Sequence, residues 1–317
     1  MTVTPPPARP RVSVIIPAYN SHDTIAPCLD ALSRQTYRAF EVVVVDSGPD
    51  LTTSTLVPER FPWVTFVRSP RRLFPHAARN AGVARSTGEL LLFTDPDIYG
   101  DARWIERLVD AHDRTGHVIV GALACFGERW LDRGLHLCKF SAWLPGGSMR
   151  PTHLGPTANL LISRAQFGRA GGLPDEGMLG DVTLSWNLQQ KGQRLTFVPT
   201  AIVEHHHIQS FGDFIAERYT RGRMYGQLRL ERWGRRLLPP AAMLVMTVLP
   251  VRMARIVALS ASQASGAHQL GWWAATLPVI AAGHAAALVG EASAYARRLS
   301  SRHRASMPEP RAVAQSK

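Results

Sequence analysis

The most constraining feature of this sequence is the alternation of short apolar runs with helix-length segments from Arg11 onward. Glu41–Val45 carries four consecutive valines, a pattern typical of a strand buried on both faces of a sheet. Strands alternating with helices predict an α/β fold with a mainly parallel sheet flanked by helices. The predicted strands are Val12–Ile16, Glu41–Val45, Val64–Val67 and Glu89–Phe93, and the helices are Asp23–Arg34, Pro75–Arg85 and Asp101–His112, the last with Asp101 as N-cap.

The chain changes character several times, and these changes predict its domains. Residues 1–10 are proline-rich and lack the apolar core of a signal peptide, so we expect a disordered lead-in and a start in the cytosol. Residues 117–175 are less regular. Order returns with a helix at Asp181–Lys191 and strands at Leu195–Val198 and Ala201–His205. We therefore predict an α/β domain over residues 11–215, a basic and apolar helical region over 216–296, and a basic disordered tail over 297–317.

The positive charge of the chain lies almost entirely in its last third. The formal net charge is +12, yet residues 216–317 hold 15 of the 36 basic residues and only 4 of the 24 acidic ones. The N-terminal part is nearly neutral, which argues against an acidic polymer as its ligand. The apolar segments beside the arginines favour anionic lipid over nucleic acid as the partner of the tail.

Polar clusters follow three of the predicted strands, at Pro17–Asn20, Asp46–Gly48 and Asp95–Asp97. Ligands of open α/β sheets bind beyond the carboxyl ends of the strands, so these clusters mark a candidate site. The chain has no glycine-rich phosphate cradle of the GxGxxG or GxxxxGK type. Carboxylates hold a diphosphate when Mg²⁺ or Mn²⁺ bridges the two. The alternative interpretation of Asp95 and Asp97 is a simple turn pair.

These clusters, taken in order, resemble the family 2 glycosyltransferases of the GT-A fold, which have a Rossmann-like mixed sheet. The resemblance rests on VSVIIPAYN (12–20), VVVVDSG (42–48), ARNAG (78–82) and LLFTDPDI (91–98), and it continues in residues 155–207, which are similar to the acceptor half of that family. It implies a metal-dependent, inverting transfer of one sugar from a nucleotide-sugar donor to a lipid-linked or cell-envelope glycan. It also implies Mn²⁺ or Mg²⁺ as cofactor.

The resemblance assigns roles to individual residues of the donor half. Asp95 and Asp97 correspond to the DxD motif, with Asp97 as the metal ligand and with His205 or His207 as a further candidate ligand. Solvated strand-end histidines are the alternative. The residues expected around the donor nucleotide and sugar are Pro17, Tyr19, Asn20, Asp46, Arg79, Asn80 and Asp95.

In the acceptor half, Asp181 matches the carboxylate that such enzymes use as catalytic base, and an N-cap at the start of a helix is the competing interpretation. The family usually has a Glu-Asp pair here, whereas this chain has Gly180 before Asp181. Nearby acids such as Asp175 and Glu176 are candidates for the second carboxylate. Asn159 and Trp186 complete the acceptor side, with a buried turn asparagine and a core tryptophan as their alternatives.

The apolar segments of the tail predict association with the cytoplasmic face of the cell membrane. Leu270–Gly290 is long enough to span a bilayer, and a first segment over residues 237–259 is interrupted by Arg252 and Arg255. The expectation is either two C-terminal transmembrane helices or helices lying in the interface. The QxxRW motif of processive synthases is absent from the sequence.

Two other functions remain open at this point. A catalytically inactive relative that still binds a nucleotide-sugar is suggested by Gly180 in place of an acid. A nucleotidyltransferase on a similar fold would release pyrophosphate from a nucleoside triphosphate. Both share the expected donor pocket, so turnover of a sugar donor separates them from the leading hypothesis.

Overall fold

The computed structural model describes residues 10–175, 177, 179–206, 210–233, 240–248 and 250–306. The chain forms two compact units, Met1–Gln209 with Leu259–Ile280, and Ser210–Ala258 with Ala281–Lys317. The first unit therefore contains part of the region that the sequence assigned to a separate helical segment over 216–296.

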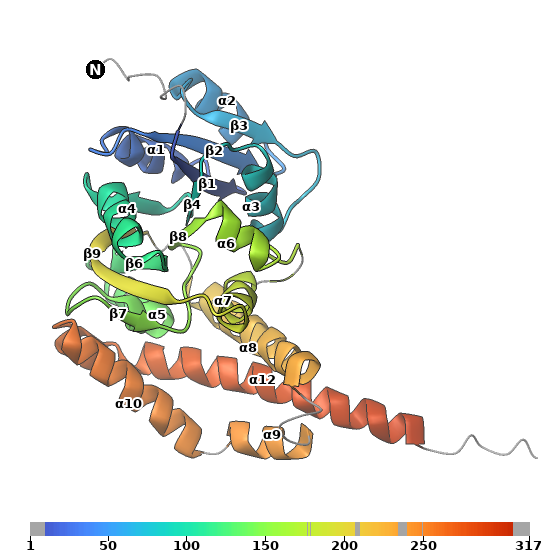
Figure 1. Cartoon of the computed structure of the whole chain (residues 1–317). Helices are drawn as coiled ribbons and strands as arrows, with labels where there is room; N and C mark the ends of the chain where they lie inside the picture. The colour runs from blue at the N-terminus through green and yellow to red at the C-terminus, as the bar shows by residue number, and fades with distance from the viewer. Residues whose placement is uncertain are drawn as a thin grey trace, which may run out of the picture. The chain divides into compact units, whose positions relative to one another are not determined.

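The first unit is built on a mixed sheet (Figure 1). Among the described residues its strand order is β3-β2-β1-β4-β8-β6-β9-β5, and β7 pairs with β9. Strands β3, β2, β1 and β4 run parallel, β8 is antiparallel to both β4 and β6, and β9 is parallel to β6 and antiparallel to β5 and β7. The bounds are β1 Val12–Ala18, β2 Phe40–Asp46, β3 Thr65–Arg68, β4 Leu90–Thr94, β5 Ile98–Gly100, β6 Val118–Cys125, β7 Arg150–Thr152, β8 Asn159–Ser163 and β9 Leu195–His205.

Helices cover both faces of this sheet. One face packs against α1 (Ile25–Ser33), α2 (Thr52–Arg60) and α4 (Trp104–Thr115). The other packs against α3 (Pro75–Ala84), α6 (Arg164–Arg169) and α7 (Gly180–Gln190). The predicted α/β sheet with flanking helices is confirmed, although the sheet is mixed beyond β4.

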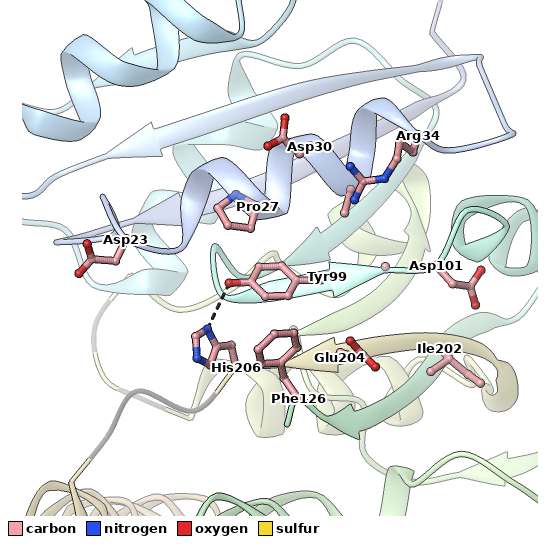
Figure 2. Close-up of a pocket in the computed structure, with 12 residues that line it drawn as sticks. Asp23, Pro27, Asp30, Arg34, Tyr99, Asp101, Phe126, Ile202, Glu204 and His206 are labelled. Carbon is pink, nitrogen blue, oxygen red and sulfur yellow. Dashed lines mark hydrogen bonds between the residues drawn. The ribbon is translucent and has the colours of Figure 1, made fainter. Parts of the chain in front are cut away.

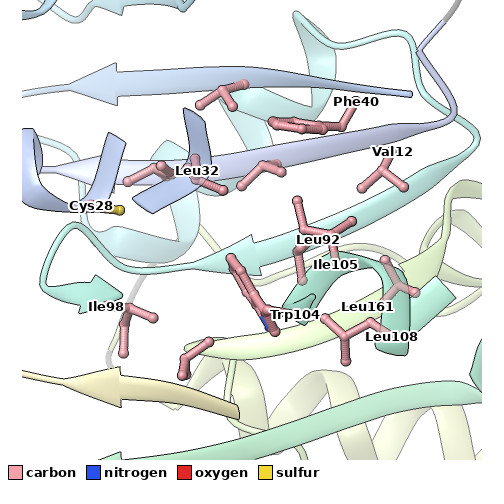
Figure 3. Close-up of a cluster of buried hydrophobic side chains, with 14 of the residues drawn as sticks. Val12, Cys28, Leu32, Phe40, Leu92, Ile98, Trp104, Ile105, Leu108 and Leu161 are labelled. Carbon is pink, nitrogen blue, oxygen red and sulfur yellow. The ribbon is translucent and has the colours of Figure 1, made fainter. Parts of the chain in front are cut away.

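The valine run of β2 explains why helices cover both faces of the sheet. Successive strand residues point to opposite faces. Val42 and Val44 lie in the core on the α1 side, whereas Val43 and Val45 lie in the core on the α3 side. Figure 3 shows the first of these cores, in which Trp104 of α4 is 1% exposed and packs with Leu92 and other fully buried side chains.

The structure differs from the sequence-based prediction in several local features, and helices α2 and α5 are among the elements that were not predicted. Leu195–Val198 and Ala201–His205 are one strand, β9, whose register against β6 shifts between Gly121 and Ala122. Asp101 is not the N-cap of α4, because Arg103 takes that position and Asp101 Oδ1 accepts a hydrogen bond from the Arg103 N–H at 2.8 Å. Strands β6 and β8 lie in the region that the sequence left irregular.

The segment Leu259–Ile280 packs on α5 (Trp130–Phe140) and the short 3-10 turn Ser141–Trp143 after it. It comprises the end of α10 (Pro250–Gly266), then α11 (Leu270–Ala275) and the start of α12 (Leu277–Ser306). Trp130 Nε1 donates to the Ala275 carbonyl at 3.0 Å, and a Cβ added at Gly134 would lie 2.8 Å from Val279. These contacts attach the segment to the first unit.

The second unit is helical, with α8 (Phe211–Trp233), α9 (Pro240–Val248) and parts of α10 and α12. Its centre is the carboxylate of Glu291, whose side chain is 4% exposed. Arg229 Nη1 and the Tyr295 hydroxyl donate to Oε1 at 2.9 and 2.6 Å, and Arg252 Nη2 donates to Oε2 at 2.6 Å. The carboxylate thus joins three helices of this unit.

By length and composition, one helical segment among the described residues is able to cross a membrane, Leu277–Leu299, with a mean hydropathy of 1.3. The first predicted span is represented by two helices, α9 of 9 residues and α10 of 17 residues. Each is shorter than the ~20 residues that a spanning helix needs. Residues 297–306, which the sequence placed in a tail, continue α12.

Candidate active site

The three polar clusters lie at the ends of three adjacent parallel strands. β2, β1 and β4 are neighbours in the sheet, and Asp46, Tyr19 and Asp95 stand at or just after their carboxyl ends. The backbone N–H of Ser47 donates to the Ala18 carbonyl at 3.0 Å, which joins the first two clusters. The sequence-based expectation that the clusters share one edge of the sheet is therefore confirmed.

The first two clusters separate into buried and exposed residues. We call the buried Asp46 and Pro17 the floor, and the exposed Tyr19 and Asn20, together with Arg72, the rim. Asp46 is 1% exposed and accepts hydrogen bonds from the Gly48 N–H at 3.0 Å, from Ser54 Oγ at 3.2 Å and from Arg68 Nη1. Pro17 is also buried, within β1. Asp46 accordingly orders the floor, because its oxygens already accept from three donors.

The rim carries the groups that are open to a ligand. The Tyr19 ring is 38% exposed, and the guanidinium carbon of Arg72 lies 4.6 Å from its centroid. Asn20 next to it is exposed and has a φ of 52°, a left-handed conformation that asparagine tolerates. Sequence reasoning missed Arg68, although it ends a fourth parallel strand, β3, beside the three that it used.

Arg79 is 2% exposed and forms an ion pair with Asp95, whose side chain is 26% exposed. The arginine reaches the end of β4 from α3, which begins with a proline in its first turn. A buried guanidinium beside a partly exposed carboxylate holds that carboxylate in place. Arg79 therefore lies next to Asp95 at the end of β4.

Asn80 lies on the same helix but bonds to the acceptor half. Its Nδ2 donates to the Leu173 carbonyl at 2.8 Å and to Asp175 Oδ1 at 2.9 Å, and its Oδ1 accepts from the Leu173 N–H at 3.3 Å. In this structure Asn80 fixes the loop that precedes α7, and Asp175 is one of its partners.

Asp97 and His205 come together at the start of β5 and the end of β9. Asp97 Oδ2 lies 3.8 Å from His205 Nε2, and the His206 N–H donates to the Asp97 carbonyl at 2.9 Å. Burial and the neighbouring charge of Asp95 raise the pKa of Asp97 to about 7. Burial lowers the pKa of His205 well below its ordinary value, so the imidazole is neutral. A carboxylate beside a neutral imidazole suits a divalent cation.

Lys139 of α5 is a neighbour of this pair that sequence reasoning missed. Its positive charge lowers the pKa values of both Asp97 and His205. The only sequence signal was its rarity, since the chain has three lysines among its 36 basic residues. Within the described part of the chain, no three His, Cys, Asp or Glu side chains gather as a metal cluster.

Asp181 lies in the first turn of α7, where its Oδ1 accepts a hydrogen bond from the Val182 N–H at 2.9 Å. The N-cap of α7 is Leu179, so the competing interpretation of Asp181 as the N-cap is wrong.

The remaining acceptor-side candidates separate into different environments. Asn159 is 0% exposed, and its amide bonds to the Ala122 and Ala201 carbonyls at 3.0 and 3.1 Å while its Oδ1 accepts from Trp104 Nε1 at 2.9 Å. The expected role of Asn159 in contacting the acceptor substrate is therefore corrected, because a fully buried side chain has no surface for such a contact. Trp186 is half-buried and belongs to neither core. Glu176 and His207 lie outside the described residues.

A cavity of about 690 Å³ opens between α1, β5 and the end of β9 (Figure 2). It is lined by the aromatic rings of Tyr99, Phe126 and His206, and the Tyr99 hydroxyl lies 3.3 Å from His206 Nδ1. Its charged lining is mostly acidic, comprising Asp23, Asp30, Asp101 and Glu204 against Arg34.

Residues 13–166 match the sequence model of the family described as Glycosyl transferase family 2. The chain is 28% identical over 231 residues to the Glycosyltransferase AglE of Haloferax volcanii, which covers 70% of this chain and 74% of that protein. It is 30% identical over 128 residues to the Undecaprenyl-phosphate 4-deoxy-4-formamido-L-arabinose transferase of Klebsiella pneumoniae, covering 38% of each.

The fold is similar to that of a solved structure, the mannosyltransferase PcManGT from Pyrobaculum calidifontis in complex with GDP-Man and Mn²⁺. The TM-score is 0.54 at 24% identity, and the match covers 88% of each chain. At this identity the similarity concerns the fold, which agrees with the mixed sheet described above.

Proposed function

We propose that this chain, a glycosyltransferase whose residues 13–166 match family 2, transfers a single sugar from a nucleoside diphosphate sugar to a lipid-linked or cell-envelope glycan, with inversion. The observation that carries the proposal is the arrangement of carboxylates around α3. Arg79 of this helix holds Asp95 at the end of β4, and Asn80 holds the loop that leads to Asp181.

In the proposed site the nucleotide lies over the rim at the ends of β1 and β2. The exposed Tyr19 ring offers a stacking surface for the base, and Asn20 lies beside it. Asp46 and Pro17 support the rim from below. Arg72, stacked on Tyr19, supplies a positive charge for the diphosphate.

Asp97 and His205 would hold Mn²⁺ or Mg²⁺ in this site, and the charge of Asp95 acts on the same carboxyl group. The close approach of a carboxylate and a neutral imidazole fits such an ion, which commonly takes few protein ligands and completes its shell with substrate phosphates. When bound, the ion stabilises the negative charge of the departing diphosphate as a Lewis acid.

Asp181 acts as general base in the proposed reaction. The acceptor hydroxyl oxygen attacks the anomeric carbon and forms the new glycosidic bond, while the bond from that carbon to the diphosphate oxygen breaks. The hydroxyl proton passes to the Asp181 carboxylate, and the nucleoside diphosphate leaves with the electron pair. Attack from the side opposite the leaving group inverts the anomeric configuration.

A lipid-linked acceptor agrees with the composition of the C-terminal region. The segment Leu277–Leu299 is long and apolar enough to cross a bilayer, and residues 216–317 carry most of the net positive charge. The printed name of the Klebsiella pneumoniae relative specifies a lipid phosphate. We place the enzyme at the cytoplasmic face of the membrane, with anionic lipid as the partner of the basic residues.

The proposal is tested with a panel of UDP-, GDP- and dTDP-sugars in Mn²⁺, measuring release of the nucleoside diphosphate in the presence of glycolipid acceptors. We expect Asp181→Asn to lower kcat by about 10²–10⁴, the usual contribution of a general base. Asp110→Asn, at an exposed carboxylate of α4, is the matched control and leaves kcat unchanged.

Three outcomes would reject the proposal. A wild type as inactive as Asp181→Asn across the whole panel indicates an inactive nucleotide-sugar-binding relative. Release of pyrophosphate from nucleoside triphosphates indicates a nucleotidyltransferase. Full activity of Asp181→Asn removes this carboxylate from the role of base.

A further inference from the structure

Helix α3 presents three polar side chains on one face. His76, Arg79 and Asn80 are spaced i, i+3 and i+4, which places them side by side on a helix. Arg79 binds Asp95 and Asn80 binds the loop at Leu173. The partner of His76 is the start of α7, 104 residues further along the chain.

His76 receives the first N–H of α7. The Gly180 N–H donates to His76 Nε2 at 2.9 Å, and the imidazole is 5% exposed. The first N–H groups of a helix have no partner within the helix, and the N-cap Leu179 supplies no side-chain acceptor. The imidazole of α3 therefore caps α7 from outside, one residue before Asp181.

The same ring also explains the glycine at position 180. A Cβ added to Gly180 would lie 2.5 Å from both Cγ and Cδ2 of His76 and 2.8 Å from Nδ1. These distances are below the 3.0 Å that real Cβ contacts respect. The imidazole occupies the space of a side chain at position 180, so His76 and Gly180 form a matched pair.

We propose that His76 is a positioning residue that fixes the first turn of α7, and with it Asp181, relative to the carboxylate of Asp95. Its Nδ1 lies 3.5 Å from Nη1 of Arg79, the residue that holds Asp95. Through these contacts, one face of α3 sets the distance between Asp95, at the proposed donor site, and Asp181, the proposed base. This inference rests on the proposed function of Asp181 and explains the absence of an acid at position 180.

The test compares His76→Ala, which removes the acceptor, with His76→Gln, whose Oε1 is able to accept the Gly180 N–H. We expect His76→Ala to lower kcat about ten- to hundredfold, because small displacements of a catalytic group have effects of this size. The KM for the nucleotide-sugar stays within about twofold, since Asp95 and the rim are unchanged. His76→Gln restores most of kcat.

A second pair of variants tests the steric match. Gly180→Ala places a methyl group against the imidazole and lowers kcat in the wild-type background. In His76→Ala/Gly180→Ala the methyl group enters the vacated space, so kcat equals that of His76→Ala alone, and the two effects are not additive. His153→Ala is the control, because this exposed histidine contacts α7 at Gln189, in its last turn, and its loss leaves kcat unchanged.

Hydrogen exchange gives a readout that does not depend on turnover. His76→Ala should speed exchange in the first turn of α7, residues 180–183, whereas His76→Gln and His153→Ala should not. A wild type without activity on any donor rejects the proposed function. An active wild type whose His76→Ala variant keeps both its kcat and its exchange protection rejects the role of His76 alone.

Discussion

The strand-end site of the first unit and the Glu291 cluster of the second unit use the same groups in opposite ways. Both pair carboxylates with arginine. At the site, Asp95 and Asp97 keep 26% and 22% of their side-chain surface exposed, and burial with like charge disfavours ionised Asp97. Glu291 is 4% exposed and accepts from two arginines and a tyrosine.

Under the proposed function, Asp95 and Asp97 are functional carboxylates and Glu291 is a structural one, and the arrangement of their partners separates the two kinds. A structural carboxylate meets its opposite charges within the protein, so its removal damages the fold. A functional carboxylate is left incompletely neutralised toward solvent, so its removal damages the reaction. The amino-acid types are identical, and only the arrangement of partners separates the two.

Among the tests of this comparison, the largest expected effect on the reaction rate follows from removing the charge of Asp97. We expect Asp97→Asn to lower the transfer rate by about 10²–10³, the usual consequence of losing a group that stabilises developing charge. The melting temperature should stay the same or rise, because the ionised carboxylate is disfavoured by burial and by Asp95. Activity assays with Mn²⁺ and thermal unfolding measure both. A lower melting temperature with full activity would contradict this prediction, because Asp97 would then have a structural role like that of Glu291.

The opposite pattern is expected for Glu291→Ala. Removing this buried carboxylate leaves the partly buried Arg229 and Arg252 without their anion, which costs up to about 3–5 kcal/mol. Denaturant unfolding should show this loss, while kcat per folded molecule stays unchanged. Arg60→Ala is the control, because its ion pair with Asp30 at 2.7 Å is exposed and is worth at most about 1 kcal/mol.

The effect that is smallest per unit change is the pH dependence of stability in the metal-free protein. The folded pKa of Asp97 is about 7 and its ordinary value is 3.8, so the folded state binds a proton that the unfolded state has lost. Stability should therefore fall as the pH rises from about 4 to 7, by at most about tenfold in the folding constant per pH unit. The difference between wild type and Asp97→Asn isolates this carboxyl. A difference that grows from about pH 4 toward pH 7 in favour of the variant confirms the sign, and a flat difference contradicts it.

Many strands and helices of the first unit could be predicted from the periodic spacing of apolar residues in the sequence. The strands β1 to β4 and helices α1, α3, α4 and α7 agree with the predicted segments, because their apolar spacing is a local property. The missed strands β6 and β8 lie among glycines and prolines, where no period stands out. The register shift in β9 depends on its pairing with β6, which no local pattern records.

In the candidate site, too, some features follow from local sequence and others depend on tertiary contacts. The sequence located the acids at the strand ends, because parallel strands bring their carboxyl ends to one edge. It misjudged Asn159, whose three hydrogen bonds to α4, β6 and β9 are visible only once the chain has folded. It also missed Lys139, which reaches Asp97 and His205 from a distant helix.

The sequence by itself determined the α/β class, the edge that bears the acids and the concentration of positive charge in residues 216–317. These follow from local spacing and composition. Only the tertiary structure decided which carboxylates are exposed and which are clamped, and why position 180 is a glycine. Those properties depend on contacts such as that of His76 with Gly180, between residues far apart in the chain, whose distance is set by packing.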